Sequence, residues 1–120
     1  MLNIEEKTQA IVNALEDIKA DDVTVIDTSK LSSMFERMII ASAKSTRQTK
    51  AIADNVVVKL KERGEPVLGR EGEDSGEWIL VDLGEVLVHI MQPAVREYYN
   101  LEELWSKAQS LRPKLAKAKQ

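Results

Sequence analysis

The pattern of hydrophobic and polar positions begins with helical spacing. Over residues 3–20, one stripe of side chains recurs at intervals of four, three, four and three positions: Ile4, Thr8, Ile11, Leu15 and Ile18. Such a stripe predicts an amphipathic helix that packs against a core along one face. Charged residues, among them Lys7, fall mostly on the other sides of this helix and are expected to face solvent.

Two strands and a second long helix are predicted next. The β-branched stretch VTVIDTS, residues 23–29, alternates between two faces and is typical of a strand. Residues 35–43 predict a second strand, whose apolar centre is expected to be buried on both faces. Ser45 or Thr46 can cap a helix that runs to about Arg63, where a glycine ends it.

The remaining elements are shorter. Pro66 opens a third strand, and the acidic, glycine-rich residues 69–76 predict a loop. After the hairpin described next, Pro93 ends strand pairing and is followed by a helical turn, and a further helix is expected from Leu101.

The stretch GEWILVDLGEVLVHIM, residues 76–91, predicts a tight β-hairpin around Gly84-Glu85. Alternation across this hairpin gives one wholly aliphatic face, which must belong to the core. The opposite face carries Trp78, Leu80, Asp82, Leu87, His89 and Met91. Burying a carboxylate and an imidazole without partners would cost several kcal/mol, on the order of 2–7 for each polar group. This second face is therefore expected to be exposed or only partly covered, which would make it a binding surface.

Other interpretations of the same residues stay open. The helix from Leu101 could cover this face, with Trp105 as a core residue. His89, the only histidine, is more often a satisfied structural side chain than a functional one. Asp82 can cap the hairpin turn or contact a partner, with neither role favoured by the sequence.

The order of elements predicts an α/β fold: a single domain with a mixed β-sheet of about five strands and helices packed against it. We assign this domain to residues 1–108. Residues 109–120 form a basic C-terminal tail that is expected to be flexible, with peripheral contact to rRNA as an alternative.

Composition narrows the function. A net charge of −3 argues against a general nucleic-acid binder, which needs a broad basic surface. The absence of cysteine excludes disulfides and thiolate metal sites, and a single histidine disfavours zinc. No apolar run is long enough for a membrane span, so a cytoplasmic protein without a membrane partner, metal or cofactor is expected.

No catalytic motif is present in the sequence. It contains no nucleophile elbow and no glycine-rich phosphate loop. The acidic loop 71–77, with Glu71, Glu73, Asp74 and Glu77, could gather a divalent cation. This gives an alternative hypothesis, a cryptic metal-dependent nucleotidyltransferase-like enzyme, although acidic loops are more often simply solvated.

The segment WILVDLGEVLVHIM followed by QPAVREYYNLEELW resembles the ribosomal silencing factor (Iojap) family, and the likeness covers about residues 3–108. The resemblance implies a nucleotidyltransferase-like topology without catalytic residues or enzymatic activity. It also implies binding to large-subunit ribosomal protein fourteen, which would block joining of the two ribosomal subunits and repress translation when nutrients are scarce. Dimers are common in the family, so a homodimer is an additional expectation.

A set of partner-binding residues follows from the hairpin face and this resemblance. Apolar area is expected from Trp78, Leu80, Leu87 and Met91. Asp82 would pair with a basic side chain of the partner, and Arg96 with an acidic side chain or an rRNA phosphate. His89 and Tyr99 complete the predicted set.

Overall fold

The computed structural model describes residues 2–105 of the 120-residue chain. The elements follow in the predicted order: α1 (Ile4–Asp17), β1 (Asp21–Asp27), β2 (Arg37–Ser42), α2 (Thr46–Glu62), β3 (Gly69–Glu71), β4 (Trp78–Asp82), β5 (Val86–Met91) and α3 (Pro93–Tyr99). The predicted tail, residues 109–120, lies outside the described residues. The prediction of an α/β domain with a mixed five-stranded sheet is confirmed.

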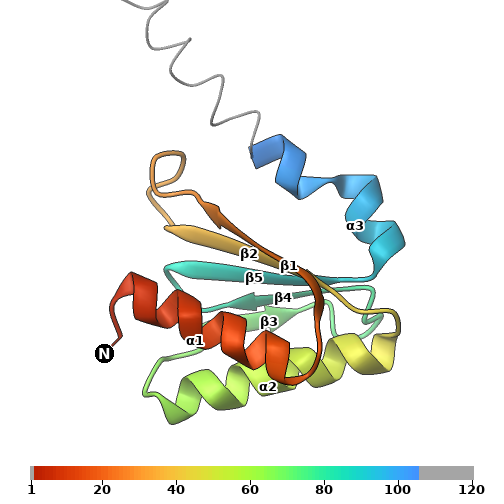
Figure 1. The fold of residues 1–120 in the computed structure, drawn as a ribbon, viewed down its shortest axis with the longest axis horizontal. Coiled ribbons are helices and arrows are strands. Elements are labelled where there is room, and N and C mark those ends of the chain that lie inside the picture. Colours follow the sequence, from red (N-terminus) through yellow and green to blue (C-terminus); the bar gives the residue numbers. More distant parts are fainter. Residues whose placement is uncertain (1, 106–120) are drawn as a thin grey trace, which may run out of the picture.

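The sheet has the strand order β1-β2-β5-β4-β3 (Figure 1). β2 and β5 run parallel, and the other three pairs are antiparallel. The third strand is shorter than predicted, because Pro66 has no backbone N–H and the ladder begins only at Gly69. Just before it, the backbone N–H of Leu68 already donates to the Asp82 carbonyl at 2.8 Å.

The first two helices begin at side-chain caps. Asn3 and Glu6 form a reciprocal capping box at the start of α1. The Ser45 side chain accepts from the backbone N–H of Gln48, which confirms one of the two predicted caps of α2. Helix α1 ends earlier than predicted, because Lys19 adopts a positive φ of 57° that a helix cannot continue through.

The main core lies between the sheet and α1 with α2, which cover the same face (Figure 1). Six hairpin side chains reach into it, each at most 1% exposed: Ile79, Val81, Leu83, Val86, Val88 and Ile90. The prediction that this aliphatic face is core is confirmed. Ile11 and Leu15 of α1 and Ile52 of α2 are fully buried against it.

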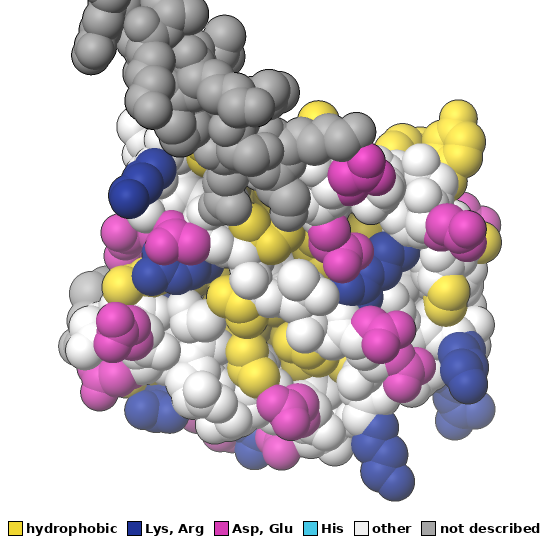
Figure 2. Space-filling view, turned by 45° about the horizontal axis from the view of Figure 1, so that its top comes forward, with side chains coloured by type: hydrophobic (Ala, Val, Ile, Leu, Met, Phe, Trp, Pro, Cys, Tyr) yellow, Lys and Arg dark blue, Asp and Glu magenta, His cyan; other side chains and the backbone are white. Residues whose placement is uncertain are grey.

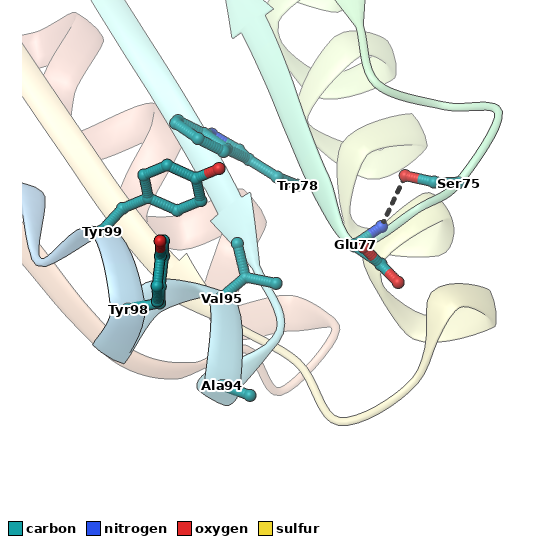
Figure 3. A pocket seen from close by; sticks show the side chains of 7 residues that line it. All are labelled: Ser75, Glu77, Trp78, Ala94, Val95, Tyr98 and Tyr99. Carbon is teal, nitrogen blue, oxygen red and sulfur yellow. Dashed lines mark hydrogen bonds between the residues drawn. The ribbon is translucent and has the colours of Figure 1, made fainter.

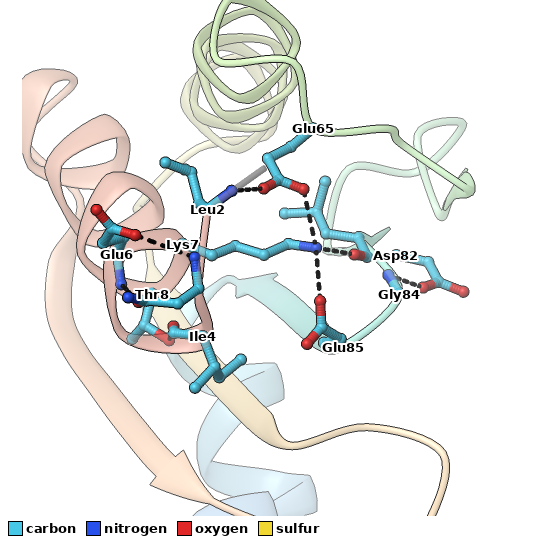
Figure 4. A network of polar contacts seen from close by, with 11 residues as sticks. Leu2, Ile4, Glu6, Lys7, Thr8, Glu65, Asp82, Gly84 and Glu85 are labelled. Carbon is cyan, nitrogen blue, oxygen red and sulfur yellow. Dashed lines mark hydrogen bonds and ion pairs between the residues drawn. The ribbon is translucent and has the colours of Figure 1, made fainter.

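Lys7 is buried, so the expectation that it faces solvent is wrong. Its side chain is 3% exposed, and its Nζ donates to the Leu83 carbonyl at 2.6 Å (Figure 4). The same nitrogen lies 3.5 Å from Oε2 of Glu65, which is 2% exposed, and 3.7 Å from Oε1 of Glu85. Glu65 also accepts from the backbone N–H of Leu2 at 2.9 Å. These contacts join the start of α1, the end of α2 and the hairpin turn.

A smaller core lies on the opposite face of the sheet. Its buried members are Ile26, Met38, Ile40 and Met91. Partly buried side chains from distant segments pack over them: Phe35, Trp78, Val95, Leu101 and Trp105. The Phe35 and Trp105 rings meet edge to face, with centroids 5.7 Å apart. Among residues 2–105, no helix is long and apolar enough to cross a membrane.

Candidate partner-binding face

The register of the hairpin is the one predicted. Trp78 pairs with Met91, Leu80 with His89 and Asp82 with Leu87, while Gly84 in the turn has a positive φ of 85°. All six members of the predicted mixed face therefore lie on the side of the sheet away from α1 and α2. The structure divides this face into a covered part and an open part.

Met91 belongs to the covered part, so its predicted role as accessible contact area is corrected. It is fully buried and packs in the smaller core with Met38 and Ile40. Leu101 and Trp105 pack against the same core, which confirms the alternative interpretation for this part of the face. Alternation along a strand gives the side of the sheet but says nothing of what covers it.

Arg96 forms its contacts with residues of its own chain. This argues against the predicted pairing of Arg96 with an acidic side chain of a partner or an rRNA phosphate. The Arg96 side chain is 11% exposed, and its guanidinium makes three contacts. Nε donates to Glu102 at 2.7 Å, Nη1 to the Ser42 hydroxyl at 2.7 Å, and Nη2 to the Thr24 hydroxyl at 3.1 Å. The hydrogen bond from Arg96 lowers the pKa of the Glu102 carboxyl. Arg96 thereby fastens α3 and the segment after it to β1 and β2.

His89 is also buried, at 7% exposed, and it has a partner inside the chain. Its Nδ1 accepts from the indole Nε1–H of Trp78 at 2.9 Å, which places the imidazole proton on Nε2. Burial lowers the pKa of His89 from 6.5 to about 4, so the ring is neutral at physiological pH. The expectation of an accessible histidine is therefore wrong, and its direct role is to hold the indole.

An aromatic cluster extends from His89 to the surface. The Trp78 ring is half-buried and lies 4.9 Å from the Tyr99 ring, which in turn lies 5.0 Å from the Tyr98 ring. Tyr98 is 81% exposed and Tyr99 is 53% exposed. Tyr98 was not among the predicted residues. The sequence does hold a signal for Tyr98. Two consecutive tyrosines on a short helix point in different directions, so they cannot both pack into the same core.

The open part of the face is a strip along β4 and β5, and we call Trp78, Leu80, Asp82 and Leu87 the open strip. All four side chains are half-buried. Asp82 accepts from the backbone N–H of Gly84 at 2.9 Å, which confirms its role as a turn cap. Its contact with a partner stays a prediction. The open strip is thus the part of the predicted surface that remains accessible.

Two hollows flank Trp78. The tyrosine hollow, of about 440 Å³, lies between α3 and the loop before β4, and its walls include Tyr98, Tyr99 and Glu77 (Figure 3). The histidine hollow, of about 240 Å³, is lined by Glu71, Gly72, Trp78, Leu80 and His89. Trp78 is the one residue that lines both of them.

The acidic loop does not assemble a metal site in the described residues. Glu73 pairs with Arg70, whose guanidinium also contacts Asp54 of α2. No group of three or more acidic or histidine side chains within residues 2–105 is placed to hold a metal ion. Gly72 shapes this loop, because its φ is 90° and a Cβ there would lie 1.9 Å from the Trp78 carbonyl oxygen. The alternative of a metal-dependent enzyme has no support in this geometry.

The surface displayed in Figure 2 gathers apolar side chains near its middle, between separate acidic and basic groups. No histidine side chain is visible on this one face.

Comparison with known proteins gives consistent matches. The family described as "Ribosomal silencing factor during starvation" matches residues 2–120. The chain is 55% identical over 104 residues to the ribosomal silencing factor of Chromobacterium violaceum, covering 87% of this chain and 85% of that protein. It is 34% identical over 99 residues to a Mus musculus protein named mitochondrial assembly of ribosomal large subunit protein 1, covering 80% of this chain and 43% of that protein. A Chromobacterium violaceum crystal structure is similar with a TM-score of 0.86 at 54% identity, over 88% of each chain.

Proposed function

The chain belongs to the ribosomal silencing factor (Iojap) family, and from this we propose that it silences translation by docking its open strip and aromatic cluster on the large ribosomal subunit. The observation that carries this proposal is the incomplete cover of one sheet face. Val95 of α3 packs over the smaller core together with Leu101 and Trp105, while Leu80 and Leu87 stay half-buried on the same face of the sheet. At the Trp78 end of this face, Tyr99 contacts the indole and is 53% exposed. Aromatic and aliphatic side chains gathered in this way are typical of the centre of a protein interface.

The partner that the family resemblance implies is large-subunit ribosomal protein fourteen. The name of the mouse relative supports a large-subunit association, since it refers to assembly of that subunit. A protein bound on the face where the small subunit joins would exclude the small subunit sterically. The chain then acts as a binding module in the cytoplasm and not as an enzyme. Contact of residues 109–120 with rRNA and competition from a homodimer are secondary parts of the same proposal.

Sedimentation with purified bacterial subunits tests this function. The protein is expected to migrate with free large subunits and to reduce the amount of joined ribosomes when small subunits are added. If the protein binds large subunits but the amount of joined ribosomes does not fall, the binding part of the proposal stands and the silencing mechanism is refuted. Absence from the large-subunit fraction would refute the proposal.

The face is tested by placing a charge on it. Leu87→Asp puts a carboxylate on the half-buried open strip and is expected to weaken large-subunit binding by about 2 kcal/mol, the range of a central interface residue. Val58→Asp is the matched control, because Val58 is 51% exposed on α2, across the sheet from the open strip. Circular dichroism establishes that both variants fold. Equal binding by the two variants would contradict docking through this face.

A further inference from the structure

The two hollows beside Trp78 share two chemical features. Each combines aromatic surface with one carboxylate, Glu77 in the tyrosine hollow and Glu71 in the histidine hollow. No lysine or arginine lines either hollow. Both carboxylates are exposed, and neither has an ion-pair partner among residues 2–105.

Trp78, the residue shared by the two hollows, is fixed in position by its own contacts. The Trp78 indole donates to His89 on one side and packs 4.9 Å from the Tyr99 ring on the other. A side chain held in this way loses little conformational entropy when a ligand packs against it, which favours binding. His89 is thus a positioning residue for the indole.

We propose that Trp78 divides a two-part socket that receives a pair of lysine or arginine side chains from a basic protein. This inference rests on the proposed function, because it specifies the chemistry that the partner must present. The methylene stems of the two side chains lie along the rings of Trp78 and Tyr98, and the cationic ends reach Glu71 and Glu77. Aromatic faces attract such cations, and the carboxylate in the lining of each hollow adds a charge-assisted contact.

Charge complementarity selects a basic protein segment over RNA. A phosphate group would meet Glu71 or Glu77 with no basic side chain in either hollow to offset the repulsion. Bases can stack on an exposed tyrosine, but the backbone that carries them would still pass these carboxylates. A neutral apolar segment would fill the hollows without using either charge.

The first test needs no ribosome. The full chain, labelled with ¹⁵N, is titrated with L-argininamide while the indole N–H resonance of Trp78 is followed. A saturable shift is expected in the wild type and in the Asp74→Asn control, which removes an exposed carboxylate of the same loop that lines neither hollow. The shift is expected to be lost in the double variant Glu71→Gln/Glu77→Gln. No shift in the wild type, or an equal shift in the double variant, overturns the socket.

The second test uses large ribosomal subunits and charge reversal. The double variant Glu71→Lys/Glu77→Lys is expected to bind them about tenfold or more weakly than Asp74→Lys, because both cations then meet like charge. Tighter binding by the double variant would identify RNA as the occupant, and an altered oligomeric state with unchanged subunit binding would identify a second copy. Either result overturns the inference. If the wild type fails to bind subunits while the argininamide shift is present, the proposed function fails and the socket stands.

Discussion

Protonation of His89 provides a sharp test of the site geometry. The imidazole is 7% exposed, and burial lowers its pKa from 6.5 to about 4. Above about pH 6.5 the ring is neutral in the folded and the unfolded chain, so its contribution to stability is fully present. As the pH falls from 6.5 towards 4, the unfolded chain binds a proton that the folded chain excludes. The free energy of unfolding therefore decreases through this window.

The size of the effect follows from the two pKa values. One pKa unit corresponds to about 1.4 kcal/mol, so the complete effect is about 3 kcal/mol. Between about pH 7.5 and about pH 5, the loss attributable to His89 is about 2 kcal/mol. This is large enough to measure beside a typical total stability of about 5–15 kcal/mol.

Urea unfolding at the two pH values measures the loss, with His89→Gln as the reference variant. Glutamine does not titrate and keeps an oxygen that can accept from the Trp78 indole, so subtracting its pH dependence removes the contribution of the carboxylates. His89 is the only histidine, and its ring-proton resonance therefore gives the pKa directly. Equal pH dependence in the wild type and the variant, or a measured pKa near 6.5, would refute the buried Trp78–His89 pair.

Three further predictions concern stability. Arg96→Ala should destabilise the chain by about 3 kcal/mol, because it removes the three contacts that fasten α3, and faster hydrogen exchange of the α3 amides would report this. Gly72→Ala should lower the free energy of unfolding by about 3 kcal/mol or more, because the new Cβ would clash with the Trp78 carbonyl and the backbone φ is positive. Gly64→Ala, at a positive φ but in open space, should lower it by only about 1 kcal/mol. Similar melting temperatures for the two variants would contradict this. Lys7→Met should lower the free energy of unfolding by about 3–5 kcal/mol, because it leaves the buried Glu65 carboxylate without its ion-pair partner. Adding Glu65→Gln should restore at least half of this loss, which a double-mutant cycle measured by urea unfolding would reveal.

The sequence predicted what depends on local periodicity. Alternation gave the strands and the hairpin register from Trp78–Met91 to Asp82–Leu87, because a two-residue turn fixes one pairing, in which one face of the hairpin is wholly aliphatic. The Ser45 cap and the glycine stop of α2 were equally accessible, since both depend on neighbouring backbone groups.

Contacts between distant segments were not accessible in the same way. Lys7 lies at helical spacing from Ile4 and Ile11 and so on the core face of α1, but its charge suggested exposure. Its burial depends on Glu65 and the Leu83 carbonyl, which lie far along the chain. The cover over Met91 likewise combines residues from the β1–β2 loop, α3 and the segment after it. Two of the six residues of the predicted face, His89 and Met91, were therefore assigned to the correct side of the sheet but with the wrong accessibility.

The single parallel pairing in the sheet has a consequence for how the chain is made. β2 is synthesised early, yet its central neighbour β5 is the last strand, separated from it by α2, β3 and β4. Until residues 86–91 have left the exit tunnel of the translating ribosome, β2 has an unpaired edge and the main core lacks Val86, Val88 and Ile90. Such sequence-distant pairing slows folding, so the native sheet forms only after β5 has been synthesised. A polypeptide released before Met91 would lack the middle of the sheet and be a substrate for degradation.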